Sequence, residues 1–226
     1  MRFVPKLKQL NFIYKVKLKI RFIKYFFKDL IFLIYNNTSF YYVINFIKNS
    51  LVNKKHNILV DNFFLQSNFF YNDWFIFKSS LFIKNFEKNN NEKNKIKNIL
   101  EIGSFEGRSS IFFLNYFNNS QLTCVDTWEG SQEHKDTLMI KVEENFDNNL
   151  KYYFNRFSKH KTNSNLFFKT CSKKFNLIFI DGYHHYKQVM ADAENSLKYI
   201  EKGGYILFDD FTFKFSGYKK GENAIN

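Results

Sequence analysis

Cysteine and proline are nearly absent from this chain of 226 residues, which has two cysteines, one proline and only eight glycines. The thiols of Cys124 and Cys171 lack the spacing of metal ligands, so we expect a reduced, intracellular setting, either the cytoplasm or an organelle. Phe, Tyr, Asn, Lys and Ile are instead abundant, and AT-rich codons favour all five. Aromatic-rich stretches are therefore not taken as functional signals.

Long apolar runs are also missing near the N-terminus. The longest, residues 30–35, is far shorter than the ~20 residues of a membrane span. We expect no secretory signal, because the uninterrupted apolar run and small-residue cleavage site of such a signal are lacking. An amphipathic surface helix stays open as an alternative, since basic residues are interleaved there with Phe, Ile and Leu.

Acidic residues are rare in residues 1–50, the basic arm, where ten Lys or Arg stand against Asp29 alone. The rest of the chain holds 24 basic and 20 acidic residues, so most of the net charge of +13 lies in this arm. Two interpretations remain open. The arm contacts phosphate groups of RNA or anionic lipid, or it is a solvated helical extension in which Lys is the default polar residue.

The chain divides into three parts. Residues 1–60 are expected to form a basic helical extension, with a break at the polar residues 36–39. Residues 61–97 are a connecting segment, and the polar low-complexity stretch 88–98 is expected at the surface. Residues 98–226 have the pattern of one α/β domain.

Within residues 98–226, short apolar strands alternate with helices. The expected strands are 98–102, 121–125, 153–158, 175–180 and 205–208, and the expected helices are 108–117, 136–150, 163–170 and 186–200, the last ended by Gly203-Gly204. Continuous apolar strands separated by helices are typical of a parallel sheet covered on both faces. The predicted fold class is therefore α/β, with a doubly wound, mostly parallel sheet.

A glycine-containing turn follows the first expected strand, in the segment Glu101-Ile102-Gly103-Ser104-Phe105-Glu106-Gly107-Arg108-Ser109. Glycines let the backbone approach a ligand closely, and the following helix N-terminus presents free N–H groups. The spacing differs from the G-x-G-x-x-G that cradles a pyrophosphate, and we expect Glu101 to face a cationic or amino-bearing ligand. A tight strand–helix turn without a ligand would explain the same residues.

Asp126 closes the second strand, 25 residues after Glu101. A carboxylate at this position can accept hydrogen bonds from both ribose hydroxyls of a nucleoside, although it can equally cap a turn.

The last two strands carry a third motif, with Asp181-Gly182-Tyr183-His184 after one and Asp209-Asp210 after the other. Neighbouring strands lie about 4.8 Å apart, so the three Asp carboxylates are expected to meet at the carboxyl edge of the sheet. Carboxylates that close repel one another unless a cation joins them, and oxygen ligands favour Mg²⁺ or Ca²⁺.

In order and spacing, these motifs resemble the Rossmann-like class of S-adenosylmethionine-dependent methyltransferases over residues 98–211. Within it they resemble the metal-dependent O-methyltransferases of small molecules such as macrolide sugars, the macrocin O-methyltransferase-like group. The resemblance places the methionine moiety at Glu101, Gly103 and Gly107 and the ribose at Asp126. Further cofactor-binding residues implied by it are Ser104, Ser109, Thr127 and Trp128.

The resemblance also implies that Asp181, Asp209 and Asp210 are metal ligands and that His184 acts as the catalytic base beside Asp181. His185 is the competing candidate. The sheet of this family usually ends in an antiparallel hairpin, for which too few residues follow Asp210. We expect either a truncated chain or a sheet edge covered by the basic arm or a partner.

The leading functional prediction is methyl transfer from S-adenosylmethionine to a hydroxyl of a small molecule, with Mg²⁺ and possible self-association. An alternative is a binding component of a ribonucleoprotein or membrane complex, with the methyltransferase fold as scaffold and the basic arm as tether. RNA methylation is a third alternative. It is disfavoured because Asp181-Gly182-Tyr183-His184 stands where amino-methylating enzymes have an Asn-Pro-Pro-type motif.

Overall fold

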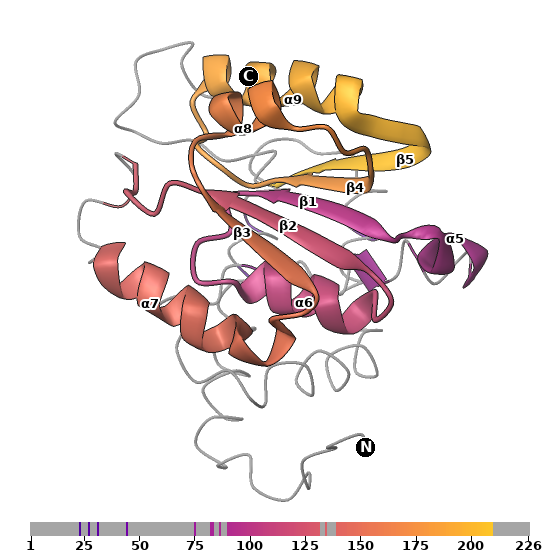
Figure 1. Cartoon of the computed structure of the whole chain (residues 1–226), viewed down its shortest axis with the longest axis horizontal. Coiled ribbons are helices and arrows are strands. Elements are labelled where there is room, and N and C mark those ends of the chain that lie inside the picture. Colours follow the sequence, from indigo (N-terminus) through magenta and orange to yellow (C-terminus); the bar gives the residue numbers. More distant parts are fainter. Residues whose placement is uncertain are drawn as a thin grey trace, which may run out of the picture.

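The structure is a computed structural model of the whole chain (Figure 1). It describes residues 90–131, 134 and 139–209 together with the isolated positions 23, 27, 31, 44, 75, 82, 83 and 86. The expected helical extension and connecting segment, residues 1–97, thus lie largely outside the described residues, as do Asp210 and all residues after it.

Five parallel strands form one sheet in the order β3-β2-β1-β4-β5. The strands are β1 (Asn98–Ile102), β2 (Gln121–Asp126), β3 (Phe157–Lys161), β4 (Phe175–Ile180) and β5 (Ile200–Phe208). The helices are α5 (Asn90–Lys95), α6 (Arg108–Tyr116), α7 (Met139–Leu150), α8 (Ser164–Thr170) and α9 (Tyr186–Tyr199). The chain therefore has the predicted Rossmann-like α/β fold.

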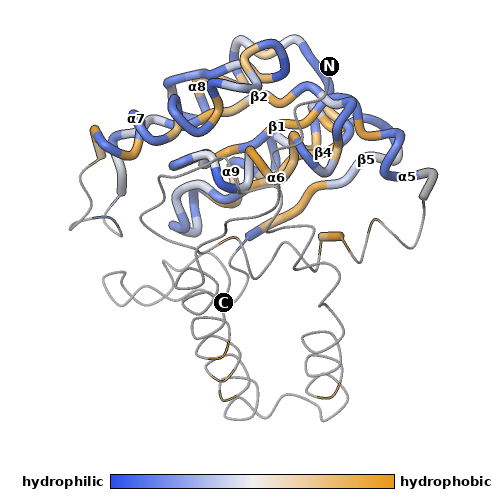
Figure 2. The backbone as a smooth tube through the Cα atoms, turned by 90° about the horizontal axis from the view of Figure 1, so that it is seen from below, coloured by the Kyte–Doolittle hydropathy of each residue, from blue (hydrophilic) through white to orange (hydrophobic). Residues whose placement is uncertain are grey.

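The helices cover both faces of the sheet, with α6 and α7 on one face and α8 and α9 on the other (Figure 1). Alternate residues of β1 show why. Ile99 packs into the core under α6, whereas Leu100 and Ile102 pack into the core under α8 and α9. Strands buried on both faces are apolar at nearly every position, as β4 is, whereas β5 is hydrophobic mainly in its last part (Figure 2).

The bounds of β3 and the start of β5 differ most from the sequence prediction. The third strand begins at Phe157 rather than at Tyr153, because α7 continues into a 3₁₀ turn, Lys151–Tyr153, in which the Tyr153 hydroxyl accepts a hydrogen bond from Asn115 Nδ2 (2.7 Å). The last helix ends at Tyr199, one residue before its predicted end, and β5 begins directly after it at Ile200 and not at Tyr205. Gly203 and Gly204 instead lie inside β5, where the register against β4 shifts between Phe175 and Leu177. A left-handed Gly203 (φ +79°) accommodates this irregularity.

A further difference concerns the polar stretch before β1, which was expected to be a surface connection and not part of the core. It contains the short helix α5, and Ile96 after it is buried in the core.

None of the helices in the described part of the chain has the length and apolar character that a membrane span needs.

Candidate cofactor and catalytic site

The loops that carry the predicted motifs meet at the carboxyl edge of the sheet. The N–H of Gly103 donates to Val125 O at the end of β2 (2.9 Å), and the N–H of Asp181 donates to Ile102 O at the end of β1 (2.8 Å). The N–H of Asp209 donates in turn to Ile180 O (2.9 Å). Backbone hydrogen bonds thus join the loops after β1, β2, β4 and β5 into one surface.

The two glycines of the first motif are required by protein packing. Gly103 (φ +89°) lies so close to the β4 loop that a Cβ there would be 2.0 Å from Asp181 O. Gly107 (φ +78°) packs on α7, and a Cβ there would be 2.3 Å from Leu150 Cδ1. Neighbouring protein atoms therefore explain both glycines, and the close approach of a ligand to them stays a prediction.

Glu101 does not face the open edge of the sheet, contrary to the sequence prediction. Its side chain is fully buried and accepts hydrogen bonds from Ser104 Oγ (2.8 Å), Ser109 Oγ (2.5 Å) and Ser110 Oγ. Burial raises the pKa of the Glu101 carboxyl, and the three hydroxyls partly oppose this. Glu101, Ser104 and Ser109 therefore brace the glycine loop from inside. Ser110 was missed in the sequence, where only its place beside Ser109 marks it.

The carboxylate of Asp126 accepts hydrogen bonds from two backbone N–H groups, one in the glycine loop and one just after β2. Its Oδ2 accepts from Phe105 N and its Oδ1 from Trp128 N, both at 2.8 Å. Burial raises the pKa of Asp126, while the N–H groups of Trp128 and Phe105 and the nearby His134 act in the opposite direction. Each carboxylate oxygen has a second lone pair, so Asp126 retains the capacity to accept from ribose hydroxyls.

Trp128 is buried, although the sequence motif suggested a residue that touches the cofactor. Its ring lies 4.8 Å from the ring of Phe146, centroid to centroid, and Lys159 Nζ lies 4.6 Å from its centroid. Thr127 beside it is half-buried, and its Oγ1 accepts from Glu129 N (3.2 Å).

His134 is a residue of this site that sequence reasoning missed. Its ring stacks on Phe105 with centroids 5.2 Å apart, and its Nδ1 lies 2.9 Å from Ser131 Oγ. Nothing in the local sequence marks His134 as a site residue. Only the tertiary structure brings it beside the glycine loop.

Asp181 and Asp209 lie on adjacent strand ends, since Ile180 pairs with Phe208 in the register of β4 and β5. His184 Nε2 lies 3.6 Å from Asp181 Oδ1, and both side chains are mostly buried. His185 instead stacks on Tyr183, with centroids 5.7 Å apart, and begins α9. Of the two candidate bases, His184 is therefore the one that faces Asp181.

The metal site stays a prediction. Asp181 and Asp209 supply oxygen atoms suited to Mg²⁺ at one edge, but Asp210 is outside the described residues. Among those residues, no group of three His, Cys, Asp or Glu side chains could hold a metal ion.

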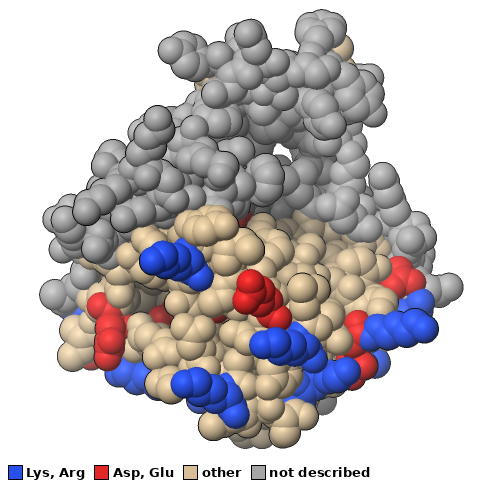
Figure 3. Space-filling view, turned by 90° about the horizontal axis from the view of Figure 1, so that it is seen from above, with Lys and Arg blue, Asp and Glu red and all other residues tan. Residues whose placement is uncertain are grey.

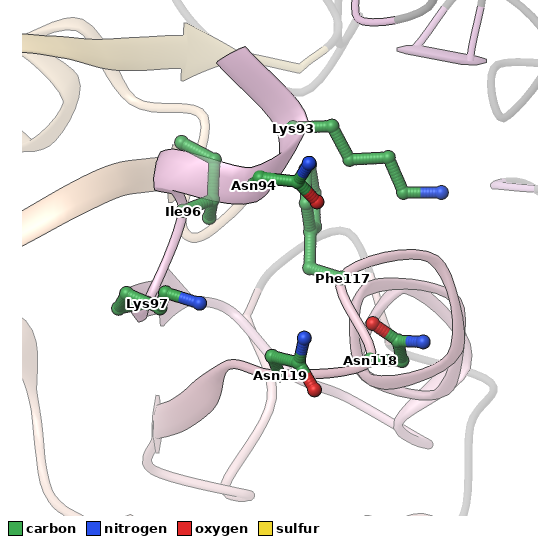
Figure 4. Close-up of a pocket in the computed structure, with 7 residues that line it drawn as sticks. All are labelled: Lys93, Asn94, Ile96, Lys97, Phe117, Asn118 and Asn119. Atoms are coloured by element: carbon green, nitrogen blue, oxygen red, sulfur yellow. The ribbon is translucent and has the colours of Figure 1, made fainter. Parts of the chain in front are cut away.

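A shallow hollow lies at the opposite, amino edge of the sheet (Figure 4). It is lined by Lys93, Asn94, Ile96, Lys97, Phe117, Asn118 and Asn119, which precede β1 and β2. Ligands of open parallel sheets bind at the carboxyl edge, so this hollow is not part of the candidate site.

Comparison with known proteins agrees with the motif geometry. Residues 100–211 match a family model described as a methyltransferase domain. Uncharacterized protein R132 of Acanthamoeba polyphaga mimivirus is 29% identical over 112 residues, which make up 50% of this chain and 50% of that protein. The chain thus spans about half the length of this curated relative.

Two of the solved structures to which this chain is similar are methyltransferases. Podospora anserina methyltransferase PaMTH1, solved with SAH, is 20% identical over 60% of this chain and 53% of its own, with a TM-score of 0.45. The MycE methyltransferase of the mycinamycin pathway, solved with Mg, SAH and mycinamycin VI, is 16% identical over 81% of this chain and 47% of its own, with a TM-score of 0.45. The family match, together with the strand order and the position of the motifs, shows that residues 100–211 are a methyltransferase domain of the Rossmann-like class.

Proposed function

We propose that the protein is an S-adenosylmethionine-dependent O-methyltransferase that acts on a small hydroxylated molecule such as a sugar and uses a divalent cation. The contact between the two halves of the site carries this proposal. A Cβ on Gly103 would lie 2.0 Å from Asp181 O, so the glycine loop and the acidic turn are packed directly together. A donor held by the first and an acceptor held by the second would be neighbours, and such proximity supplies much of the catalysis of group transfer.

The donor half would consist of the glycine loop and Asp126. S-adenosylmethionine supplies an electrophilic methyl group on a positively charged sulfur. The Asp126 lone pairs not used by Phe105 and Trp128 would accept hydrogen bonds from the ribose hydroxyls. Glu101 would keep the loop in shape from inside, through its three serine partners.

The acceptor half would consist of Asp181, Asp209, Asp210 and His184. The three carboxylates would hold the divalent cation, whose charge makes a nearby hydroxyl more acidic. His184 would take the hydroxyl proton onto its imidazole. Asp181 Oδ1, 3.6 Å from Nε2, would then stabilise the imidazolium.

Calorimetric titration of the full chain with S-adenosylmethionine tests the donor half. We expect the wild type to bind and Asp126→Ala to bind more weakly by about 1.5–3 kcal/mol, the contribution of hydrogen bonds to a charged group. Glu194→Ala, an exposed carboxylate on α9, is the matched control and should bind as the wild type does. Failure of the wild type to bind would refute the proposal, and unchanged binding by Asp126→Ala would place the nucleoside elsewhere.

The same titration tests the acceptor half when it is repeated with MgCl₂ in place of the cofactor. Binding of Mg²⁺ by the wild type and its loss in Asp181→Asn plus Asp209→Asn is the expected result. Methylation of a hydroxylated acceptor that continues in excess EDTA would remove the cation from the proposal and leave the donor half intact.

A further inference from the structure

Phe105 has an unusual backbone conformation at the centre of the donor half. Its φ is +45°, in the left-handed region that residues with a side chain seldom occupy. Such a conformation persists only where the surrounding structure holds it. The residue lies between Gly103 and Gly107 in the loop that would contact the methionine end of the cofactor.

Two hydrogen bonds hold the peptide groups on either side of Phe105. Its N–H donates to Asp126 Oδ2, and its carbonyl oxygen accepts from Trp128 Nε1, both at 2.8 Å. The N–H of Trp128 donates to Asp126 Oδ1, also at 2.8 Å. These three bonds close a ring among Phe105, Asp126 and Trp128, so the indole N–H fixes the glycine loop relative to the proposed ribose-binding carboxylate.

The indole ring itself is buried inside the protein. Trp128 is only 3% exposed, and its ring is packed between Phe146 of α7 and Lys159 of β3. Its one donor is used by Phe105 O. An effect of the indole N–H on cofactor binding therefore passes through the carbonyl oxygen of Phe105.

We propose that Trp128 is a positioning residue for S-adenosylmethionine, which acts by holding Phe105 in its left-handed conformation and not by contact with the cofactor. This inference rests on the proposed function for its cofactor. The coupling between Trp128 and residue 105 is, however, a property of the protein that can be measured without the cofactor.

Trp128→Phe tests the proposal because it keeps an aromatic ring and removes the N–H. We expect it to weaken S-adenosylmethionine binding about fivefold, the effect of one net hydrogen bond. Phe105→Gly should rescue binding in this background, because glycine adopts the left-handed region without strain. Phe105→Ala is the matched control. It loses the same phenyl ring but keeps the strain, so it should not rescue binding.

Wild-type affinity in Trp128→Phe, or equal affinities of Phe105→Gly and Phe105→Ala in that background, would overturn the proposal. Urea unfolding gives a second measurement, in which Trp128→Phe is combined with each substitution of Phe105. Trp128→Phe should lower the free energy of unfolding less in the presence of Phe105→Ala than in the presence of Phe105→Gly, because Ala can relieve its strain by leaving the left-handed region once the hydrogen bond is lost, whereas Gly has no strain to relieve. Equal losses would also overturn the coupling. If the wild type binds no S-adenosylmethionine, the proposed function fails, and the urea result alone decides whether Trp128 holds residue 105.

Discussion

The carboxylate of Glu101 lies beneath the glycine loop with no exposed surface and three serine hydroxyls around it. Hydroxyls stabilise a buried charge less well than water does, so desolvation dominates and the pKa of Glu101 is raised. A residue named in the sequence as a ligand contact is therefore a structural group whose charge state affects stability.

Glu101→Gln should change how stability depends on pH. Below about pH 4.3, the ordinary glutamate value, Glu101 is protonated in both the folded and the unfolded state. As pH rises above that value the unfolded state loses the proton first, so the free energy of unfolding of the wild type falls until pH passes the raised folded-state pKa. The amide of Gln does not titrate. The variant should therefore gain stability relative to the wild type over this window.

Urea unfolding at a series of pH values from 4 upwards measures this difference. The pKa of buried Asp192 on α9 is also raised, but Asp192 is present in both proteins and its effect cancels in the comparison. A stability difference that stays constant with pH would show that Glu101 does not titrate as its burial requires.

Among the elements, the contact between the start of α6 and the end of α7 determines how the glycine loop is held. Gly107 precedes α6 with φ +78°, and the space beside its Cα is filled by Leu150 and Phe146 of α7. Asn149 Nδ2 strengthens the same junction by donating to Glu106 O (2.8 Å). The loop is thus supported by α7 as well as by the strand before it.

Gly107→Ala should destabilise the protein more than Gly203→Ala does. Both glycines are left-handed, at φ +78° and +79°, so both substitutions incur the same backbone strain of about 1–2 kcal/mol. No other atom lies within 4 Å of the Cβ position at residue 203, whereas Leu150 Cδ1 would lie 2.3 Å from the Cβ at residue 107. The additional loss at residue 107 should be roughly 1–3 kcal/mol, the cost of overpacking a core.

Urea unfolding of the two variants measures the comparison, with Leu150→Ala added to Gly107→Ala as a check. The shorter side chain should remove the extra loss caused by the clash, so the two substitutions should not be additive. Equal losses at residues 107 and 203 would mean that α7 moves aside and does not hold the loop.

At the scale of the whole molecule, most of the net positive charge and the predicted catalytic motifs lie in different parts of the chain. Ten of the 34 basic residues lie in residues 1–50, against Asp29 alone, whereas the motifs lie within residues 101–210. On the face shown in Figure 3, the described Lys and Arg side chains are interspersed with Asp and Glu and form no single basic patch. If the protein binds a polyanion, we therefore expect the basic arm to be the segment that makes the contact.

Removal of residues 1–49 should abolish binding to labelled poly(U) RNA or to phosphatidylserine vesicles and leave S-adenosylmethionine binding intact. Binding by the full chain should weaken at least about tenfold between 50 and 200 mM salt, because contact with a polyanion releases counterions. Fluorescence anisotropy and vesicle sedimentation measure the two partners separately. Salt-insensitive or absent binding by the full chain would identify the charge as compositional. Joint loss of solubility and cofactor binding would instead show that the arm is a structural part of the domain. In that case the arm would have to cover the free edge of β5, which pairs only with β4 among the described strands.

Much of the fold follows from the sequence, because the period of apolar residues and the chemistry of turns are local properties of the chain. The bounds of β1 and β4 are as predicted, and the neighbouring positions of Asp181 and Asp209 follow from the geometry of parallel strands. The misplaced start of β5 has a local cause as well. Gly203-Gly204 was interpreted as a helix stop, but the same residues serve as an irregularity within β5.

The tertiary structure alone decided where the site's side chains point. Glu101 turns inward to serines of α6, Trp128 is enclosed by α7 and β3, and His184 rather than His185 faces Asp181. Each outcome depends on which atoms fill the adjacent space, and those atoms come from other elements of the chain. A sequence pattern therefore indicates that a polar or aromatic residue belongs to this edge of the sheet, while packing between distant segments determines whether that residue meets a ligand or supports one that does.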